Sequence, residues 1–244
     1  MGAQRKDGRK PDEIRPVAIR RGFTEFAPGS VLIELGKTRI LCTAMVTDGV
    51  PPFLLGTGQG WLTAEYAMLP SATPGPRKMR DGRAARPDGR SVEIQRLVGR
   101  ALRTIVDLKA IPDRTIWVDC DVLQADGGTR VAAITGAYVA LYDAMLDLDH
   151  QRQLRRWPIQ TQVAAISVGL VGSAPVVDLC YAEDSGAEVD MNVVMTGTGE
   201  FVEIQGTAEK KPFGRPQFDA MLDLARKGID RLFEAQASAL GLAR

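Results

Sequence analysis

The stretch Asp126–Arg130 reads Asp-Gly-Gly-Thr-Arg and combines two glycines with an arginine. Gly127 and Gly128 let the backbone turn sharply and approach a ligand closely. Arg130 adds a planar guanidinium that can hold a phosphate through two hydrogen bonds, and the first N–H groups of a following helix attract anions. These features predict a phosphate cradle. An ordinary strand break with a surface arginine is the alternative, and the motif alone leaves both open.

A second set of candidate residues lies in the acidic stretch from Tyr181 to Asn192. Asp184 falls in a predicted turn, and Asp190 directly precedes the apolar segment Met191–Met195. Two carboxylates brought together could hold Mg²⁺, which takes few protein ligands and completes its shell with water and substrate phosphate. The alternative is a turn residue and a strand-end residue that are merely solvated, and it stays open at this point.

The charge distribution narrows the chemistry, although the 244-residue chain has a formal net charge of only +1. Between Arg77 and Arg103 there are nine basic and three acidic residues, so the net charge of this stretch is +6. From Asp178 to Glu209 there are eight acidic residues and no Lys or Arg. The first stretch could attract a polyanion, and the second could bind a metal ion.

Several common catalytic systems are excluded by residues that the chain lacks. His150 is the single histidine and lies in a polar connection, so the chain cannot form a Ser-His-Asp triad or a His-based metal site. It has no Walker A sequence, and the glycines of Gly56–Gly60 miss the dinucleotide-binding spacing. The remaining arginines, glycines and carboxylates favour phosphoryl or nucleotidyl transfer.

The elements that must position these residues are predicted by hydrophobic periodicity. A strand over Thr115–Leu123 precedes the Gly-Gly turn, and a helix rich in small residues runs from Val131 to about Asp149. A second helix is predicted from Ser91, as its N-cap, to about Lys109, after a long exposed loop over Leu69–Gly89. A hairpin over Ser30–Met45 and a strand over Trp61–Met68 complete the first half.

The second half is predicted to follow the polar connection His150–Pro158 and to contain four strands before a closing helix. The strands are Thr161–Val171, Val176–Ala182, Val189–Met195 and Phe201–Ala208, mostly with the apolar character of a buried sheet, and the helix is Phe218–Leu240. We therefore expect an α/β (α+β) protein. Residues 1–244 would form a single domain of two pseudo-repeated halves, about 15–149 and 159–240.

The sequence favours a cytoplasmic protein without a membrane segment. We find no apolar run that approaches the roughly 18 residues of a membrane span, and the first residues lack a secretory h-region. Cys42, Cys120 and Cys180 each lie in an apolar, strand-like run, which predicts three reduced core residues.

Eight ordered blocks, from Arg15 almost to the end of the chain, resemble bacterial ribonuclease PH. They are RPV, GSVLIELGKTRILCTA, GWLTAEYAMLP, GRSVEIQRLVGRALR, DCDVLQADGGTR, AITGAYVAL, EDSGAEVDMNVVMT and EIQGTAE. The resemblance implies a ribosomal protein S5 domain 2-like fold in a ring-forming subunit. It also implies a homo-oligomer, a hexamer built as a trimer of dimers.

The activity that the resemblance implies is phosphorolytic 3′→5′ exoribonuclease activity on tRNA precursors and other RNA 3′ ends. Such an enzyme transfers terminal nucleotides to inorganic phosphate, its co-substrate, and releases nucleoside diphosphates. The alternative is a non-catalytic RNA-binding subunit of a ring-shaped RNA-processing complex. Departures from the family pattern over Ser71–Arg77 and Ala208–Lys211 concern substrate preference more than chemistry.

The resemblance also assigns roles to individual residues. The family's phosphate-binding arginine corresponds to Arg90. Its Gly-Thr-Arg phosphate loop corresponds to Gly128, Thr129 and Arg130. The acidic pair implicated in Mg²⁺ binding and acid catalysis corresponds to Asp184 and Asp190. The basic loop thought to guide tRNA corresponds to Arg77 and Arg80, and Arg83 and Arg86 continue this expected RNA-binding surface.

Overall fold

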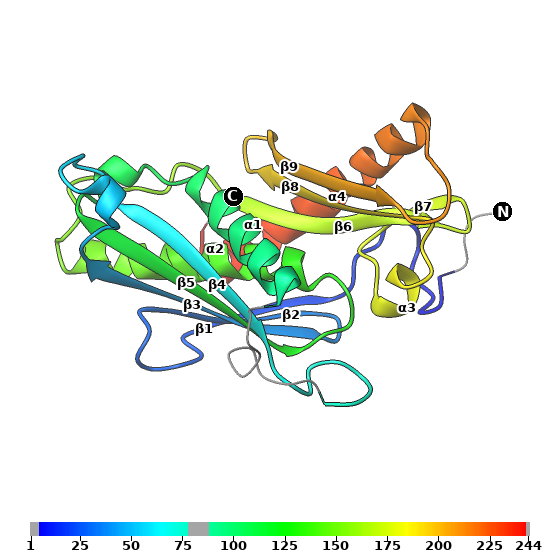
Figure 1. The fold of residues 1–244 in the computed structure, drawn as a ribbon, viewed down its shortest axis with the longest axis horizontal. Helices are drawn as coiled ribbons and strands as arrows, with labels where there is room; N and C mark the ends of the chain where they lie inside the picture. Colours follow the sequence, from blue (N-terminus) through cyan, green and yellow to red (C-terminus); the bar gives the residue numbers. More distant parts are fainter. Residues whose placement is uncertain (1–4, 78–87, 243–244) are drawn as a thin grey trace.

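A computed structural model describes residues 5–77 and 88–242, which form two β-sheets with helices packed on them (Figure 1). The first sheet has the strand order β1-β2-β3-β5-β4, and neighbouring strands are antiparallel except for the parallel pair β4 and β5. Its strands are β1 (Val17–Arg21), β2 (Gly29–Leu35), β3 (Thr38–Asp48), β4 (Trp61–Met68) and β5 (Arg114–Gln124).

The second sheet is antiparallel throughout and has the strand order β7-β6-β8-β9. Its strands are β6 (Val163–Val171), β7 (Ala174–Val177), β8 (Val189–Thr196) and β9 (Phe201–Ala208). The helices in the described part of the chain are α1 (Gly89–Arg103), α2 (Thr129–His150), α3 (Tyr181–Asp184) and α4 (Arg215–Leu240), with 3-10 turns η1 (Pro52–Leu54) and η2 (Leu108–Ala110).

Helix α2 lies between the two sheets at the centre of the hydrophobic core. It packs on β2 and β3 of the first sheet and on β6 of the second. A Cβ at Gly136 would lie 2.7 Å from Ile33 Cγ2 in β2, so only glycine allows this approach. Small residues on α2 thus bring both sheets close to one helix. Helix α4 covers β6 and β7 with a buried stripe that includes Met221, Ala225 and Ile229.

The composition of α2 also meets the criteria for a membrane span. The helix has 22 residues and a mean hydropathy of 1.4, yet 83% of the apolar window is buried inside the protein. Burial on all sides accounts for such a composition. The search for uninterrupted apolar runs did not single out α2, whose average hydropathy alone meets these criteria, and the burial of the helix is that of a core element.

Most elements of the first half agree with the sequence prediction. The hairpin forms with its turn at Gly36, whose φ of +58° suits glycine, and β4 has the predicted bounds. In β5 the alternating residues Ile116, Val118, Cys120 and Val122 are all buried, and their neighbours are less so. The three cysteines are buried and unbridged, as predicted.

The predicted ends of α1 are wrong. Asp88, not Ser91, is the N-cap, since its side chain accepts a hydrogen bond from Arg90 N at 3.4 Å. The helix ends at Arg103 because the following residues have other partners. Asp107 caps η2 through a 3.0 Å bond from Lys109 N, and Val106 pairs with Ile159.

Two expectations for the second half are also wrong. The strand predicted to continue to Ala182 ends at Val177, Asp178 has a left-handed backbone with a φ of +55°, and a single helical turn, α3, follows. Strand β9 lies at the edge of its sheet and is exposed over most of its length, unlike the buried strand that was expected. Its open face becomes a wall of the candidate site.

Candidate active site

Two neighbouring cavities bring together the residues that the sequence singled out for chemistry. One, of about 610 Å³, is lined by Arg90, Arg130, Asp184 and Asp190. The other, of about 450 Å³, is lined by Gly127, by Gly128 and Thr129 of the predicted phosphate loop, and again by Arg90 and Asp184. Residues from both halves of the chain, nearly 100 positions apart, therefore surround one hollow. Their assigned roles remain predictions.

The phosphate loop connects the end of β5 to the start of α2. Gly127 and Gly128 have φ values of +77° and +68°, and a Cβ at Gly127 would lie 2.7 Å from the carbonyl oxygen of Leu179. The Thr38 hydroxyl fixes the loop, because Oγ1 donates to Gly127 O at 2.8 Å and accepts from Asp126 N at 2.9 Å. Gly127, Gly128 and Thr129 line the smaller cavity, so α2 begins at its wall.

Tyr66, on β4, orients a hydroxyl of this loop. Its buried phenol donates a hydrogen bond of 2.8 Å to Thr129 Oγ1, and burial raises the pKa of Tyr66, so the donor keeps its proton. Because Thr129 Oγ1 accepts here, its own proton can point elsewhere, including toward a bound anion. Tyr66 was not singled out from the sequence, where an aromatic residue in a strand reads as core.

Arg130 lies in the first turn of α2 and is held by two side chains. Its Nη1 donates to Glu93 Oε1 at 3.1 Å and to Gln205 Oε1 at 2.8 Å, and Gln205 Nε2 donates to the same Glu93 oxygen at 3.0 Å. Both hydrogen bonds to described residues use Nη1, which leaves Nε and Nη2 for a ligand. Arg90 is exposed at the start of α1, and its guanidinium has no ion-pair partner within the described ranges.

The two aspartates approach the cavity from the second half of the chain. Asp184 ends α3, and Asp190 is in β8. Burial raises the pKa of Asp190 to about 6, and Asp184 contributes to this rise, whereas Arg130 and Arg90 oppose it. Burial also raises the pKa of Asp184, again against the two arginines. The carboxylates thus interact with each other and with the predicted phosphate-binding side chains.

The carboxylate oxygens of Asp184 and Asp190 are the kind of ligand that Mg²⁺ prefers, although two side chains cannot fill its coordination shell. Two partly buried carboxylates that disfavour each other's charge would gain from a divalent cation between them. Across residues 5–77 and 88–242, no group of three or more His, Cys, Asp or Glu side chains is arranged to hold a metal. A site on Asp184 and Asp190 would therefore need water and substrate oxygens for the rest of its shell.

Strand β9 supplies residues that the sequence analysis missed. Asp190 and Asn192 of β8 lie opposite Thr207 and Gln205 of β9, and all four line the larger cavity. A period of two across polar residues 205, 207 and 209 was the available signal, because it puts them on one face of a strand. Lys210 also lines this cavity, and its Nζ donates to Gly186 O at 2.6 Å.

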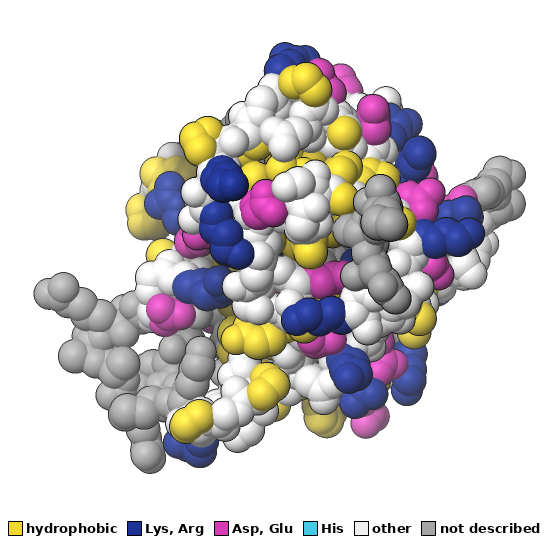
Figure 2. Space-filling model, turned by 90° about the vertical axis from the view of Figure 1, so that its right-hand side faces the viewer, with side chains coloured by type: hydrophobic (Ala, Val, Ile, Leu, Met, Phe, Trp, Pro, Cys, Tyr) yellow, Lys and Arg dark blue, Asp and Glu magenta, His cyan; other side chains and the backbone are white. Residues whose placement is uncertain are grey.

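The structure gives little support to the predicted RNA-binding arginines, because only Arg77 lies among the described residues. Arg77 is exposed and lines neither of the two cavities. Arg80, Arg83 and Arg86 lie outside the described residues. On the end of the molecule shown in Figure 2, basic and acidic side chains are interspersed rather than gathered by sign.

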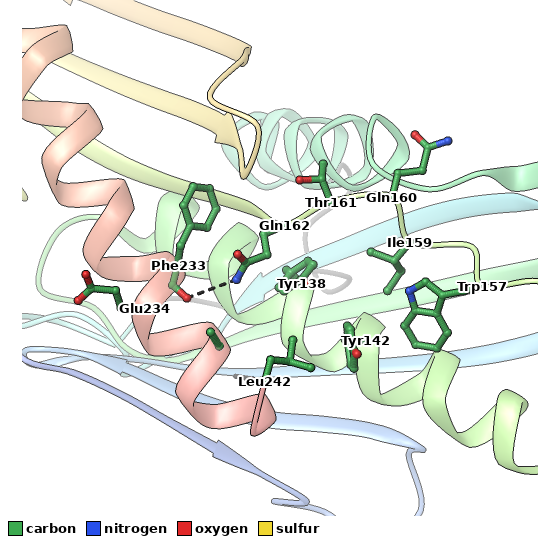
Figure 3. A pocket seen from close by; sticks show the side chains of 11 residues that line it. Tyr138, Tyr142, Trp157, Ile159, Gln160, Thr161, Gln162, Phe233, Glu234 and Leu242 are labelled. Carbon is green, nitrogen blue, oxygen red and sulfur yellow. Dashed lines mark hydrogen bonds between the residues drawn. The ribbon is translucent and has the colours of Figure 1, made fainter. Parts of the chain in front are cut away.

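Another cavity, of about 440 Å³, lies between α2 and α4 and contains none of the predicted residues (Figure 3). Tyr138, Tyr142, Trp157 and Phe233 dominate its lining, and Glu234 is its one charged side chain. The hydrogen bond drawn there joins Gln162 Nε2 to the carbonyl oxygen of Phe233 at 3.3 Å. Its lining lacks the arginines and paired carboxylates that phosphoryl chemistry needs.

Comparison with protein families gives two matches that divide the chain. Residues 13–147 match the model described as "3' exoribonuclease family, domain 1". Residues 161–228 match the model described as "3' exoribonuclease family, domain 2". Together they include Arg90, Arg130, Asp184 and Asp190.

Solved structures with a similar fold include a plant protein and two archaeal exosomes. Rice (Oryza sativa) Rrp46 has a TM-score of 0.77 at 17% identity, over 97% of this chain and 100% of that one. An Archaeoglobus fulgidus exosome "with RNA bound to the active site" gives 0.79 at 24% identity, over 95% and 92%. An archaeal exosome core gives 0.75 at 22%, over 97% and 91%. The predicted ribosomal protein S5 domain 2-like fold is confirmed.

Proposed function

The chain belongs to the ribonuclease PH family of 3′ exoribonucleases, and we propose that it is a phosphorolytic 3′→5′ exoribonuclease. The observation that carries this proposal is the arrangement of charges around the cavities. Two arginines and two carboxylates line the larger cavity, and the smaller cavity, which shares Arg90 and Asp184 with it, is lined by the glycine loop of the predicted phosphate site. A hydrolase would need to position only a water molecule, whereas phosphorolysis needs a site for inorganic phosphate.

In the proposed reaction, inorganic phosphate binds to Arg90, Arg130, the Thr129 hydroxyl and the N–H groups that begin α2. One of its oxygens attacks the phosphorus of the last phosphodiester as the bond to the preceding 3′-oxygen breaks. A nucleoside diphosphate leaves, and the shortened RNA keeps the 3′-oxygen. This oxygen needs a proton, which a water molecule in the site or whichever of the two aspartates is protonated would supply.

Asp184 and Asp190 would hold Mg²⁺, which when bound would offset negative charge on the scissile phosphate. Glu93 and Gln205 have a separate role in the proposal, since they fix the direction of the Arg130 guanidinium. A guanidinium held before phosphate arrives loses less conformational entropy on binding.

The proposed substrates are tRNA precursors and other RNA 3′ ends. This part of the proposal is supported by the family resemblance and by the basic stretch that includes Arg77 and Arg80. Lys and Arg on such a stretch would gain affinity for a folded RNA by displacing counterions from its phosphates.

A non-catalytic RNA-binding ring subunit is the second candidate. The similar structures are Rrp46 and archaeal exosomes, which supports a subunit of an RNA-processing complex over a tRNA-trimming enzyme, whereas the active site named for the Archaeoglobus fulgidus exosome supports catalysis. The catalytic candidate is supported by the four charged residues that line the larger cavity, Arg90, Arg130, Asp184 and Asp190.

Product analysis distinguishes these candidates. The protein is incubated with a 3′-extended RNA and Mg²⁺, with and without inorganic phosphate, and the released mononucleotides are identified by chromatography. Phosphorolysis predicts nucleoside diphosphates that form only when phosphate is present. Release of monophosphates without phosphate would indicate a hydrolase. Binding of the RNA without any release, under both conditions, would favour the non-catalytic subunit.

A further inference from the structure

The N-terminal segment before β1 contacts both parts of the chain that carry the candidate site, the loop at Asp126–Gly127 and the segment Asp178–Glu183. Figure 1 shows this segment running beside α3. Arg15 is its central residue, with only 5% of the residue exposed. Its guanidinium reaches the phosphate loop on one side, where Nη1 donates to Asp126 O at 2.5 Å and Nη2 to Gly127 O at 3.4 Å.

The same guanidinium reaches the segment that leads to Asp184. Arg15 Nε donates to Asp178 Oδ2 at 2.9 Å and Nη2 to Asp178 Oδ1 at 2.7 Å, and Asp178 is fully buried. Burial disfavours both charges, but each partner stabilises the other: the pKa of Asp178 is lowered and that of Arg15 is raised. The Arg15 guanidinium therefore connects the carbonyl oxygens of Asp126 and Gly127 to the Asp178 carboxylate, which precedes α3.

Other contacts reinforce this junction. Asp126 O also accepts a hydrogen bond from Tyr181 N, the first residue of α3, at 3.2 Å. Arg5 binds Glu183, the neighbour of Asp184, through two bonds of 2.8 Å, and this ion pair is buried. A four-residue helix has few stabilising contacts of its own. Its position is therefore set by these arginines.

We propose that Arg15 is a positioning residue that fixes the phosphate loop relative to the turn carrying Asp184. The proposal rests on the proposed function, because it assumes that phosphate binds the loop while the aspartates act on the RNA. Arg15 lines neither cavity and would not touch the reactants. Arg15 would instead set the distance between the phosphate bound at the loop and the RNA at the aspartates. A displacement of about 1 Å between reacting groups can cost on the order of 10²-fold in rate.

The test uses Arg15→Lys in the full chain. Lysine keeps the charge near Asp178, but a single ammonium cannot bridge the carboxylate and both carbonyls. Arg21→Lys is the matched control, because Arg21 also holds a carboxylate and a carbonyl, those of Asp143 and Ala239, away from both cavities. If Arg15→Lys does not fold, Arg15→Met with Asp178→Asn removes both charges, and Asn tolerates the left-handed backbone at 178.

Two measurements are made on each variant. Amide hydrogen exchange is expected to become about 10-fold or more faster in residues 125–130 and 178–186, with α4 unchanged. Phosphate-dependent kcat/KM is expected to fall by about 10- to 100-fold, with a higher KM for phosphate. Arg21→Lys should change neither the exchange of these two segments nor the kinetics.

Unchanged exchange in the two segments would overturn the proposal, as would faster exchange with wild-type kinetics. A wild-type protein that shows no phosphate-dependent release would contradict the proposed function instead. In that case the exchange measurement still decides whether Arg15 holds the two segments together.

Discussion

Arg130 is the residue whose contacts bear most directly on phosphate binding. Its Nη1 donates to Glu93 and Gln205, and Arg130 lines the larger cavity. Arg130→Ala removes a charge-assisted clamp, so we expect activity to fall by on the order of 10² or more, mainly through weaker use of phosphate. The KM for phosphate and the KM for RNA, measured separately, show where the loss occurs.

Arg100→Ala is the matched control for this substitution. Arg100 is also tied to β9, through a 2.6 Å ion pair with Glu203, but it does not line either cavity of the site. Its replacement should leave phosphate use unchanged. A normal KM for phosphate and normal turnover in Arg130→Ala would contradict the assigned phosphate site.

Asp190 gives a prediction about stability and pH. Its pKa is about 6 in the folded protein, compared with 3.8 for an unperturbed Asp, so the folded state keeps a proton that the unfolded state has lost. Stability is therefore lost as the pH rises from about 4 to about 6. Asp190→Asn cannot ionise. The free energy of unfolding of Asp190→Asn minus that of wild type should therefore increase by on the order of 2 kcal/mol from pH 4 to pH 8.

Urea unfolding at both pH values, without Mg²⁺ or phosphate, tests this prediction. Asn192→Ala changes a neighbouring residue of the cavity without removing an ionisable group, and its effect should not depend on pH in this way. If the difference between Asp190→Asn and wild type is the same at pH 4 and pH 8, burial of the Asp190 charge does not cost stability.

At the residue scale, the sequence indicated the charged groups of the site but not their supports. Arg130, Asp184 and Asp190 were candidates by residue type, and the family resemblance assigned a role to them and to Arg90. Arg15 and Tyr66 act through contacts with residues more than 60 positions away, at Asp178 and Thr129. Local periodicity does not record such contacts, so nothing in the sequence singled out either residue as a support of the site.

The phosphate loop depends on Gly127 for two separable reasons. Its backbone is left-handed, and a Cβ would lie 2.7 Å from the carbonyl oxygen of Leu179. Gly172 has a similar φ of +56°, but a Cβ there would meet nothing within 4 Å. Gly172→Ala should therefore cost only the backbone strain of about 1 kcal/mol and leave turnover unchanged.

Gly127→Ala should cost about 1–2 kcal/mol more than Gly172→Ala, because a backbone atom must move, and it should lower turnover by about 10-fold or more. Chemical denaturation and phosphorolysis assays on the two variants give this comparison. Equal losses of stability and equal activities in the two variants would show that the close approach to Leu179 does not matter.

The elements differ in how well the sequence predicted them, for a physical reason. The hairpin of β2 and β3, β5 and α2 follow from regular burial on one face or on all sides, which periodicity records. The end of β7 and the turn α3 are set by the buried Asp178 and by Glu183, which pair with arginines of the N-terminal segment. The exposure of β9 depends on its place at the sheet edge, which follows from topology.

At the scale of the whole molecule, the open edge at β9 bears on assembly. Phe201 and Ile204 of this strand are 50% and 37% exposed, and the strand pairs only with β8 within the described residues. Exposed strand edges favour pairing with another chain. We expect a homo-oligomer, a hexamer on the family resemblance, so light scattering should give about six times the 26.4 kDa of the chain. A monomer that is stable and fully active over a wide concentration range would contradict this.

The central claim is that inorganic phosphate itself attacks the RNA, and labelled oxygen tests it most directly. The protein is incubated with a 3′-extended RNA in ordinary water and phosphate labelled with oxygen-18, and the released nucleotides are analysed by mass spectrometry. The account predicts nucleoside diphosphates whose β-phosphate retains all its labelled oxygens, because the attacking oxygen becomes the bridge between the two phosphorus atoms. Release of unlabelled monophosphates would contradict it, since water would then be the nucleophile.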